Sequence, residues 1–381
     1  MARLPRPRGP ITDELFATLR RPPEVLPRLP APDPDVSPEA DEDLQLALYC
    51  CYELHYRGFE GVDERWEWAP GLLACRSMLE VLFESALEEL VPPEPFERDA
   101  ADMDLVLREV ADADDGPSLA RYVEAHATEE QLLEFLVHRS AYQLKEADPH
   151  SWAIPRLSGP PKAALVEIQA DEYGGGNPAR IHARLFADSM HALGLDAEYG
   201  AYLDHLPAAT LATVNLMSLL GLHRRLRGAI VGHLALFEMT SSAPNRRYGR
   251  GLRRLGFDSP EATRFFDEHV EADAVHENVA AVDLAGGLAR REPELAGQIV
   301  WGARVLAALD RRWADHLLSA WEDDRSSLRY PVPEGRDRSS APLGALKPDS
   351  LCVPSQNGRS LDFPQRQSAT VDRSTEISRP S

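Results

Sequence analysis

The chain's clearest helix signal is the segment TEEQLLEFLVHRSAYQLKEAD (residues 128–148). Thr128 is followed three residues later by Gln131, the pattern of a capping box in which two side chains satisfy free backbone amides at a helix start. Apolar residues then recur through the segment at helical spacing. These features predict a long helix that packs one face into a core.

The same periodicity extends on both sides of this segment. No stretch alternates apolar and polar residues for long enough to indicate a strand. The sequence therefore predicts an all-α fold, a multi-helix bundle. Further helices are expected at about 44–52, 66–90, 103–110, 160–173, 178–193, 209–225, 227–240, 260–280 and 292–322.

Proline is concentrated at the two ends of the chain. Ten of the 31 prolines lie in residues 1–40, and seven lie in residues 331–381 together with nine serines. Such segments lack the apolar periodicity needed to offset the entropy of ordering, so both are predicted to be disordered. The stretch DADDGP (112–117) predicts a boundary between an N-terminal helical extension (41–115) and a larger helical domain (116–330).

Composition narrows the class of protein. The net charge of −21 argues against binding of nucleic acid, which needs a basic surface, and against adsorption to anionic membranes. The four cysteines are too few for a disulfide scaffold in 381 residues. No apolar signal segment follows Met1, and the longest apolar stretch (208–222) is too short to span a bilayer. A cytoplasmic protein without a membrane partner is expected.

Several catalytic motifs are absent from the sequence. It contains no GxSxG, no GxxxxGK[ST], no HExxH, and no GxGxxG after a predicted strand. These absences argue against a nucleophilic hydrolase, a nucleoside triphosphatase, a zinc protease and a dinucleotide-dependent dehydrogenase. Histidines and carboxylates on helices remain, and these are the usual ligands of a metal site inside a helical bundle.

The segment DEHVEADAVHE (267–277) holds the sharpest metal-binding pattern. His269, Asp273 and His276 lie at positions i, i+4 and i+7, so a helix presents all three on one face. Two imidazoles and a carboxylate on one helix face can chelate a metal. The alternative is an exposed charged face with a surface histidine pair.

Two further segments supply carboxylates and a histidine. Glu172 and His182 flank Gly-Gly-Gly-Asn-Pro, and each glycine costs about 1 kcal/mol inside a helix. This break allows the two flanking helices to turn toward each other. The alternative, favoured for this segment taken alone, is an ordinary loop between two helices. Glu238 lies in the apolar stretch GHLALFEMTSS (232–242), where a carboxylate is costly unless it is paired or metal-bound. Its alternative partner is Arg246 or Arg247.

Taken together, the candidates are three carboxylates and three histidines from three segments. This mixture of oxygen and nitrogen ligands suits non-haem iron or manganese better than zinc or copper, and six ligands suit two metals. A ferritin-like site needs two Glu-x-x-His pairs, and here only Asp273-x-x-His276 approaches that pattern.

These residues resemble the haem-oxygenase-like di-iron oxidase and oxygenase superfamily, also known as iron-containing redox enzymes. The resemblance covers about residues 134–321 and implies a haem-oxygenase-like helical bundle that binds two Fe(II) ions per chain. The metal ligands implied by the resemblance are Glu172, His182, Glu238, His269, Asp273 and His276. Family members that N-oxygenate amines have a further carboxylate before the first pair, and Glu146 lies at a similar distance here. Its alternative is a solvated glutamate at a helix end, and Glu134 is the second choice for that role.

The resemblance implies an O2-dependent oxidase or oxygenase that acts on a small organic substrate: an amine, an amino acid or a fatty acid. An external electron donor and a homodimer are further expectations. Tyr142 and Tyr173 are candidate neighbours of the metals, and Arg224, Arg225 and Arg227 are candidates for binding a substrate carboxylate or, alternatively, form a surface helix end. Two competing functions remain open: a metal-free enzyme of the same architecture, such as a cofactorless oxidase or thiaminase-like hydrolase, and a non-catalytic helical interaction protein.

Overall fold

A computed structural model describes residues 1–23, 28–113 and 116–332, with the backbone alone for residues 271–275. Apart from one isolated bridge between Ala2 and Phe59, the regular structure in this part of the chain is helical. The prediction of an all-α fold is confirmed. The helices are α1 (Pro10–Leu19), α2 (Glu42–Glu53), α3 (Pro70–Leu90), α4 (Met103–Asp112), α5 (Leu119–Ala125), α6 (Glu129–Gln143), α7 (Asp148–Ser151), α8 (Gly159–Glu172), α9 (His182–Ala192), α10 (Ala208–Leu222), α11 (Arg227–Arg254), α12 (Pro260–Asn278), α13 (Gly286–Arg291) and α14 (Ala296–Glu322).

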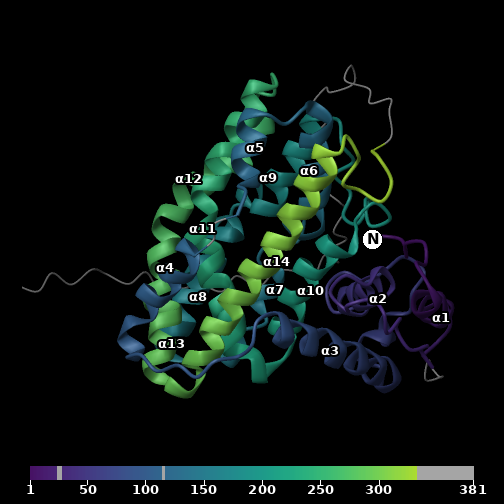
Figure 1. Ribbon diagram of the computed structural model, residues 1–381, viewed down its shortest axis with the longest axis horizontal. Coiled ribbons are helices and arrows are strands. Elements are labelled where there is room, and N and C mark those ends of the chain that lie inside the picture. Colours follow the sequence, from purple (N-terminus) through teal and green to yellow (C-terminus); the bar gives the residue numbers. More distant parts are fainter. Residues whose placement is uncertain (24–27, 114–115, 333–381) are drawn as a thin grey trace, which may run out of the picture. The chain divides into compact units, whose positions relative to one another are not determined.

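The bundle is organised around α11, which packs along both α12 and α14 (Figure 1). Two glycines allow α11 and α14 to approach closely. A Cβ atom on Gly232 would overlap the carbonyl of Ile299, and one on Gly302 would overlap the carbonyl of Ala229. The backbones of the two helices therefore meet directly, and interior packing of this density fixes their relative positions.

The predicted break after α8 is present. Three consecutive glycines adopt positive φ angles, among them Gly175 at 58°, a conformation that other residues rarely adopt. The chain reverses there, so that Glu172 at the end of α8 and His182 at the start of α9 face each other. After α12, residues Val279–Ala285 continue as a π-helix, a rare form that is frequent near functional sites.

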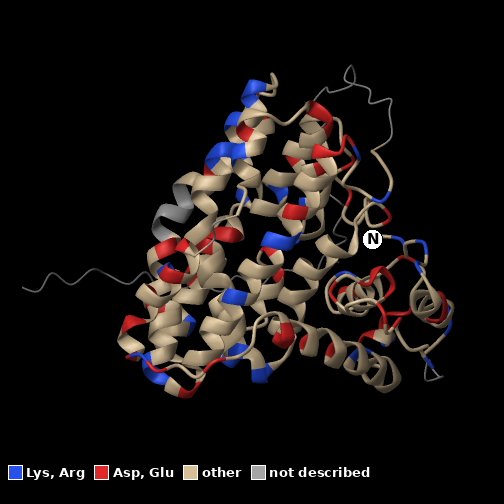
Figure 2. Cartoon of the chain, viewed as in Figure 1, with Lys and Arg blue, Asp and Glu red and all other residues tan. Residues whose placement is uncertain are grey.

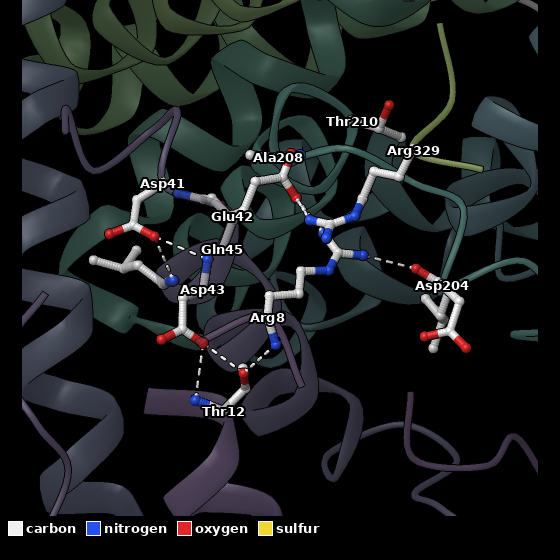
Figure 3. A network of polar contacts seen from close by, with 12 residues as sticks. Arg8, Thr12, Asp41, Glu42, Asp43, Gln45, Asp204, Ala208, Thr210 and Arg329 are labelled. Carbon is white, nitrogen blue, oxygen red and sulfur yellow. Dashed lines mark hydrogen bonds and ion pairs between the residues drawn. The ribbon is translucent and has the colours of Figure 1, made fainter. Parts of the chain in front are cut away.

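The N-terminal segment differs from its prediction. Residues 10–19 form α1, which packs on α2 and buries Ile11, Leu15 and Phe16. The Asp43 carboxylate of α2 accepts hydrogen bonds from the backbone amides of Ile11 and Thr12, at 2.7 and 2.9 Å, at the positive end of the α1 dipole (Figure 3). The prediction of disorder over residues 1–40 is therefore wrong for this segment, because its partner lies about thirty residues further along the chain.

The predicted boundary at 112–117 does not divide the molecule into two compact units. The helix before it, α4, packs against α11 and α14, and the described residues on both sides of the stretch cluster as one unit. Residues 114–115 of this stretch lie outside the described residues, as do residues 333–381 of the predicted disordered tail, including Cys352.

Acidic and basic residues are interspersed over the helices in the view of Figure 2, so the excess of carboxylates is not gathered into one patch there. Among the described residues, no helix combines the length and the apolar character needed to cross a membrane. The charged groups that bear on function are instead the buried ones.

Candidate metal centre

The structure brings candidate ligands together in two groups that share one residue. The first group is Glu146, Glu172, His182 and His269, and the second is Glu172, Glu238 and His276. Within each group the donor atoms lie within 4.8 Å of one another, and all of these residues are buried. Glu172 is common to both groups, which is the position that a bridging carboxylate requires.

Each donor comes from an element whose local structure aims it at this point. Glu146 lies in the turn after α6, where the next residue, Ala147, has a φ of 70°. His269 lies on α12, and its Nδ1 donates to the carbonyl oxygen of Phe265 at 2.7 Å. That bond directs Nε2 toward Glu146 Oε1, 3.5 Å away, as expected for a metal-binding imidazole whose second nitrogen is anchored.

Several nitrogen and oxygen atoms of these side chains have no hydrogen-bond partner. His182 Nδ1 lies 2.9 Å from Glu172 Oε2, and His276 Nδ1 lies 3.5 Å from Glu238 Oε2. Even so, Glu146 Oε2, Glu172 Oε2, His182 Nδ1 and His276 Nδ1 are buried without a hydrogen-bond partner. Buried polar atoms are normally paired, so this set of unsatisfied atoms indicates a place where a metal ion can bind.

A small cavity lies among these side chains. Its volume is about 10 Å³, and Glu146, Glu172, Glu238 and His269 all line it. Unsatisfied carboxylate and imidazole atoms around a space of this size fit metal ions, and three carboxylates with three histidines fit iron better than zinc or copper.

The buried carboxylates and imidazoles of the centre shift one another's pKa values. Burial by itself would raise the pKa of Glu172, but His182, followed by His269 and His276, holds that pKa below its usual range. Burial would lower the pKa of His182, and the adjacent Glu172 raises it instead. Burial likewise opposes protonation of His276, yet contacts with Glu238 and Asp171 raise its pKa to about 9. Without metal, the centre therefore holds protons that a metal must displace.

This proton competition predicts a pH dependence of metal binding. Because the pKa of His276 is raised from 6.5 to about 9, the imidazole is mostly protonated at neutral pH. A metal must displace this proton, so the affinity for the metal falls by up to about a factor of ten for each pH unit below the pKa of His276. Titration of the metal-free chain with Mn(II) is expected to show affinity that rises from pH 7 to about 9 and then levels off. Constant affinity over this interval would contradict the assignment of His276.

The remaining predicted residues fall in different places. Asp273 lies within residues 271–275, whose side chains are outside the described part. Glu134, the second choice beside Glu146, accepts hydrogen bonds from Trp321 and Ser327 at 2.8 and 2.9 Å. It is not in either ligand group, so that alternative is wrong. Of the two arginines suggested as alternative partners of Glu238, Arg247 instead pairs with Glu124 at 3.0 Å.

The residues predicted to lie beside the metals or to bind a substrate carboxylate are found in different places. Tyr142 lines the small cavity, and burial together with the negative charge of Glu146 raises its pKa. Tyr173 instead bonds Ser151 and Asp148, each at 2.9 Å. Of the three arginines proposed for a substrate carboxylate, Arg224 is exposed, Arg225 pairs with Glu84 and Arg227 pairs with Glu292. These three form the surface helix end that was the alternative.

Sequence reasoning missed a buried histidine pair beside the centre. His150 Nε2 and His233 Nδ1 lie 3.1 Å apart, and His150 lines the same small cavity as the candidate ligands. Burial lowers the pKa of His150 to about 4, so the pair is uncharged at neutral pH. The only signal in the sequence is the placement of His233 in an apolar stretch, which is equally typical of a core histidine.

Comparison with known proteins supports this chemistry. The sequence profile of the iron-containing redox enzymes matches residues 133–311, the part of the chain that carries every candidate ligand. A nitrosourea synthase from Streptomyces achromogenes subsp. streptozoticus is 27% identical over 213 residues, which are 53% of this chain and 45% of that protein. The match thus spans less than half of the relative's length. Residues 133–311 thus match the family of iron-containing redox enzymes, and the fold is all-α and haem-oxygenase-like.

Proposed function

We propose that this protein is a non-haem di-iron enzyme, an O2-dependent oxidase or oxygenase of a small organic substrate. The observation that supports it best is the presence of two buried ligand groups that share Glu172. The proposed first metal is held by Glu146, Glu172, His182 and His269, and the second by Glu172, Glu238 and His276, with Asp273 as a further ligand of the second. Amines, amino acids and fatty acids remain the candidate substrates, and an external electron donor is part of the proposal.

The chain's own residues prepare this chemistry in three ways. Their burial excludes water, which strengthens every charge interaction inside the centre. The Phe265 carbonyl fixes the ring of His269, so that this ligand needs no reorganisation when metal binds. The anionic form of Glu172 is favoured by the surrounding histidines. Bound iron would supply the reduction of O2 and the oxidation of a substrate held beside it.

The direct test is iron analysis after anaerobic loading with Fe(II) and removal of excess metal. The wild-type chain is expected to retain about two irons, since the two groups together offer at least six ligands. Changing both His269 and His276 to alanine is expected to reduce the content below one. His191→Ala serves as a matched control because His191 is exposed on α9. Less than one iron in the wild type, or full retention in the double variant, would overturn the proposal.

Oxygen consumption separates the two competing functions from this one. A metal-free enzyme or a non-catalytic interaction protein has no use for Fe(II), so neither predicts O2 uptake that depends on iron loading. The proposed enzyme predicts that Fe(II)-loaded chain consumes O2 faster than the same concentration of Fe(II) in buffer. Equal rates would favour the competing functions.

A further inference from the structure

A second, much larger cavity adjoins the metal centre. Its volume is about 730 Å³, within the usual range for a small-molecule site. Glu146 and His269, both candidate iron ligands, form part of its wall, while exposed Arg121 lies at its outer part. A molecule in this cavity would therefore touch the metal centre at one end.

Two helices line the cavity with polar stripes that lead to the centre. Arg139 and Gln143 lie one turn apart on α6 and share one face, and Glu146 follows in the turn after the helix; all three line the cavity. On α11, Asn245 and Tyr248 lie one and two turns beyond Ser241, and all three line the cavity. Polar side chains from both helices therefore line the cavity up to Glu146.

Arg139 is a half-buried cationic group of the cavity wall that lacks an acidic partner among the described residues. Its guanidinium lies 5.4 Å from the centre of the Trp313 ring, and it makes no ion pair or hydrogen bond within the described residues. By contrast, Arg247 in the same wall is neutralised by Glu124 at 3.0 Å. A half-buried guanidinium without a counter-ion is costly, and its planar fork matches a carboxylate in two-point contact.

Two polar neighbours of Arg139 are also suited to binding a carboxylate. The Tyr248 hydroxyl has no hydrogen-bond partner within the described residues, and neither does the Asn245 side chain. Burial raises the pKa of Tyr248 to about 12, so its hydroxyl remains a proton donor at neutral pH. Both groups can donate to an oxygen anion held by Arg139.

We propose that the cavity selects a substrate bearing a carboxylate, that Arg139 binds this carboxylate, and that the opposite end of the substrate reaches the metal centre. From Arg139 to Gln143 the helix rises about 6 Å, and Glu146 lies three residues further on, in the turn after α6. Allowing for the reach of the two side chains, the substrate carries its reactive group about four to eight carbons from the carboxylate. The inference rests on the proposed function for the identity of the reacting end. It favours organic acids over simple amines.

The test compares acids with their uncharged isosteres. Straight-chain ω-amino acids of about four to eight carbons, each paired with its primary carboxamide, span the predicted reach. Calorimetry is done with the full chain, both metal-free and loaded anaerobically with Fe(II). The best acid is expected to bind at least about tenfold more tightly than its amide, which equals about 1.4 kcal/mol. Equal affinity for acid and amide, or binding of no acid in the series, would overturn the inference without the use of any variant.

Variants then assign the selectivity to Arg139. Arg139→Met is expected to abolish the preference for the acid, and Arg139→Lys to retain part of it. Arg247→Met is the matched control, because this arginine lines the same cavity but is already paired. An unchanged preference in a folded Arg139→Met chain would refute the role of Arg139.

Iron content measured on the same samples distinguishes the two proposals. Acid selectivity without iron binding would overturn the di-iron function and leave the carboxylate site standing. Iron binding without acid selectivity would do the reverse.

Discussion

Replacing Glu172 with alanine is expected to remove both metals, reducing bound iron from about two ions per chain to well below one. The reason is that Glu172 is shared by the two ligand groups, whereas each of the other described ligands belongs to one. Glu146→Ala should remove iron from the first group only, leaving about one ion. The measurement is iron per chain after anaerobic loading, with helix content followed by circular dichroism.

The matched control for this variant is Glu167→Ala. Glu167 lies on the same helix, α8, but is exposed, so its loss should leave iron binding unchanged. If Glu172→Ala binds as much iron as Glu167→Ala, then Glu172 does not bridge and the two groups are not one centre. Equal loss in Glu146→Ala and Glu172→Ala would instead show that the two ions bind only together.

The second large effect concerns a buried ion pair beside the centre. Lys145 precedes the candidate ligand Glu146, and its Nζ lies 3.2 Å from Glu53 Oε2 on α2. Both side chains are essentially inaccessible, at 1% and 0% exposure. Tyr199 also donates to this Glu53 oxygen at 2.5 Å, and the Lys145 ammonium lies 4.4 Å from the centre of the Tyr56 ring.

Changing Lys145 to methionine is expected to lower the free energy of unfolding by about 3–5 kcal/mol, because Glu53 is left as an uncompensated buried charge. The double variant Glu53→Gln, Lys145→Met should recover a large part of this loss, since it removes both charges. Urea unfolding followed by circular dichroism measures each value.

Lys162→Met is the control for the loss of a lysine, because Lys162 makes no ion pair within the described residues. Its effect should stay within about 0.5 kcal/mol. If Lys145→Met were no more destabilising than Lys162→Met, the buried pair would not stabilise the fold. A loss of iron in Lys145→Met that the double variant restores would also show that α2 positions Glu146.

This pair connects the predicted N-terminal extension (41–115) to the turn that carries Glu146. The helix α2 contacts the turn that carries Glu146 through Glu53 and Lys145, and α1 is anchored to α2 through Asp43. No local periodicity reveals these contacts, because the residues that make them are distant from each other in the sequence.

The length of α11 could not be predicted from the local sequence either. Its apolar pattern predicted an end near residue 240, and a proline follows at 244, yet the helix runs on to Arg254. Proline removes one backbone hydrogen bond and disfavours a helix locally. Packing of α11 against α5, α12 and α14 outweighs that cost, and this packing is absent from any local pattern.

The sequence by itself determined the helical class and the candidate ligands that share one helix. Hydrogen bonds between residues i and i−4 impose a period of 3.6, so apolar spacing reveals helices, and His269 and His276 fall on one face wherever α12 packs. The glycine break between Glu172 and His182 was readable for the same local reason.

Only the tertiary structure decided which groups meet across helices. Glu134 and Glu146 are both buried, one on α6 and the other just after it, and among the described residues only the second reaches the other candidate ligands. Likewise Arg139 faces the cavity, while Arg225 and Arg227 are paired at the surface. The physical reason is that these choices depend on the rotation and approach of whole helices, which packing between segments far apart in the sequence determines.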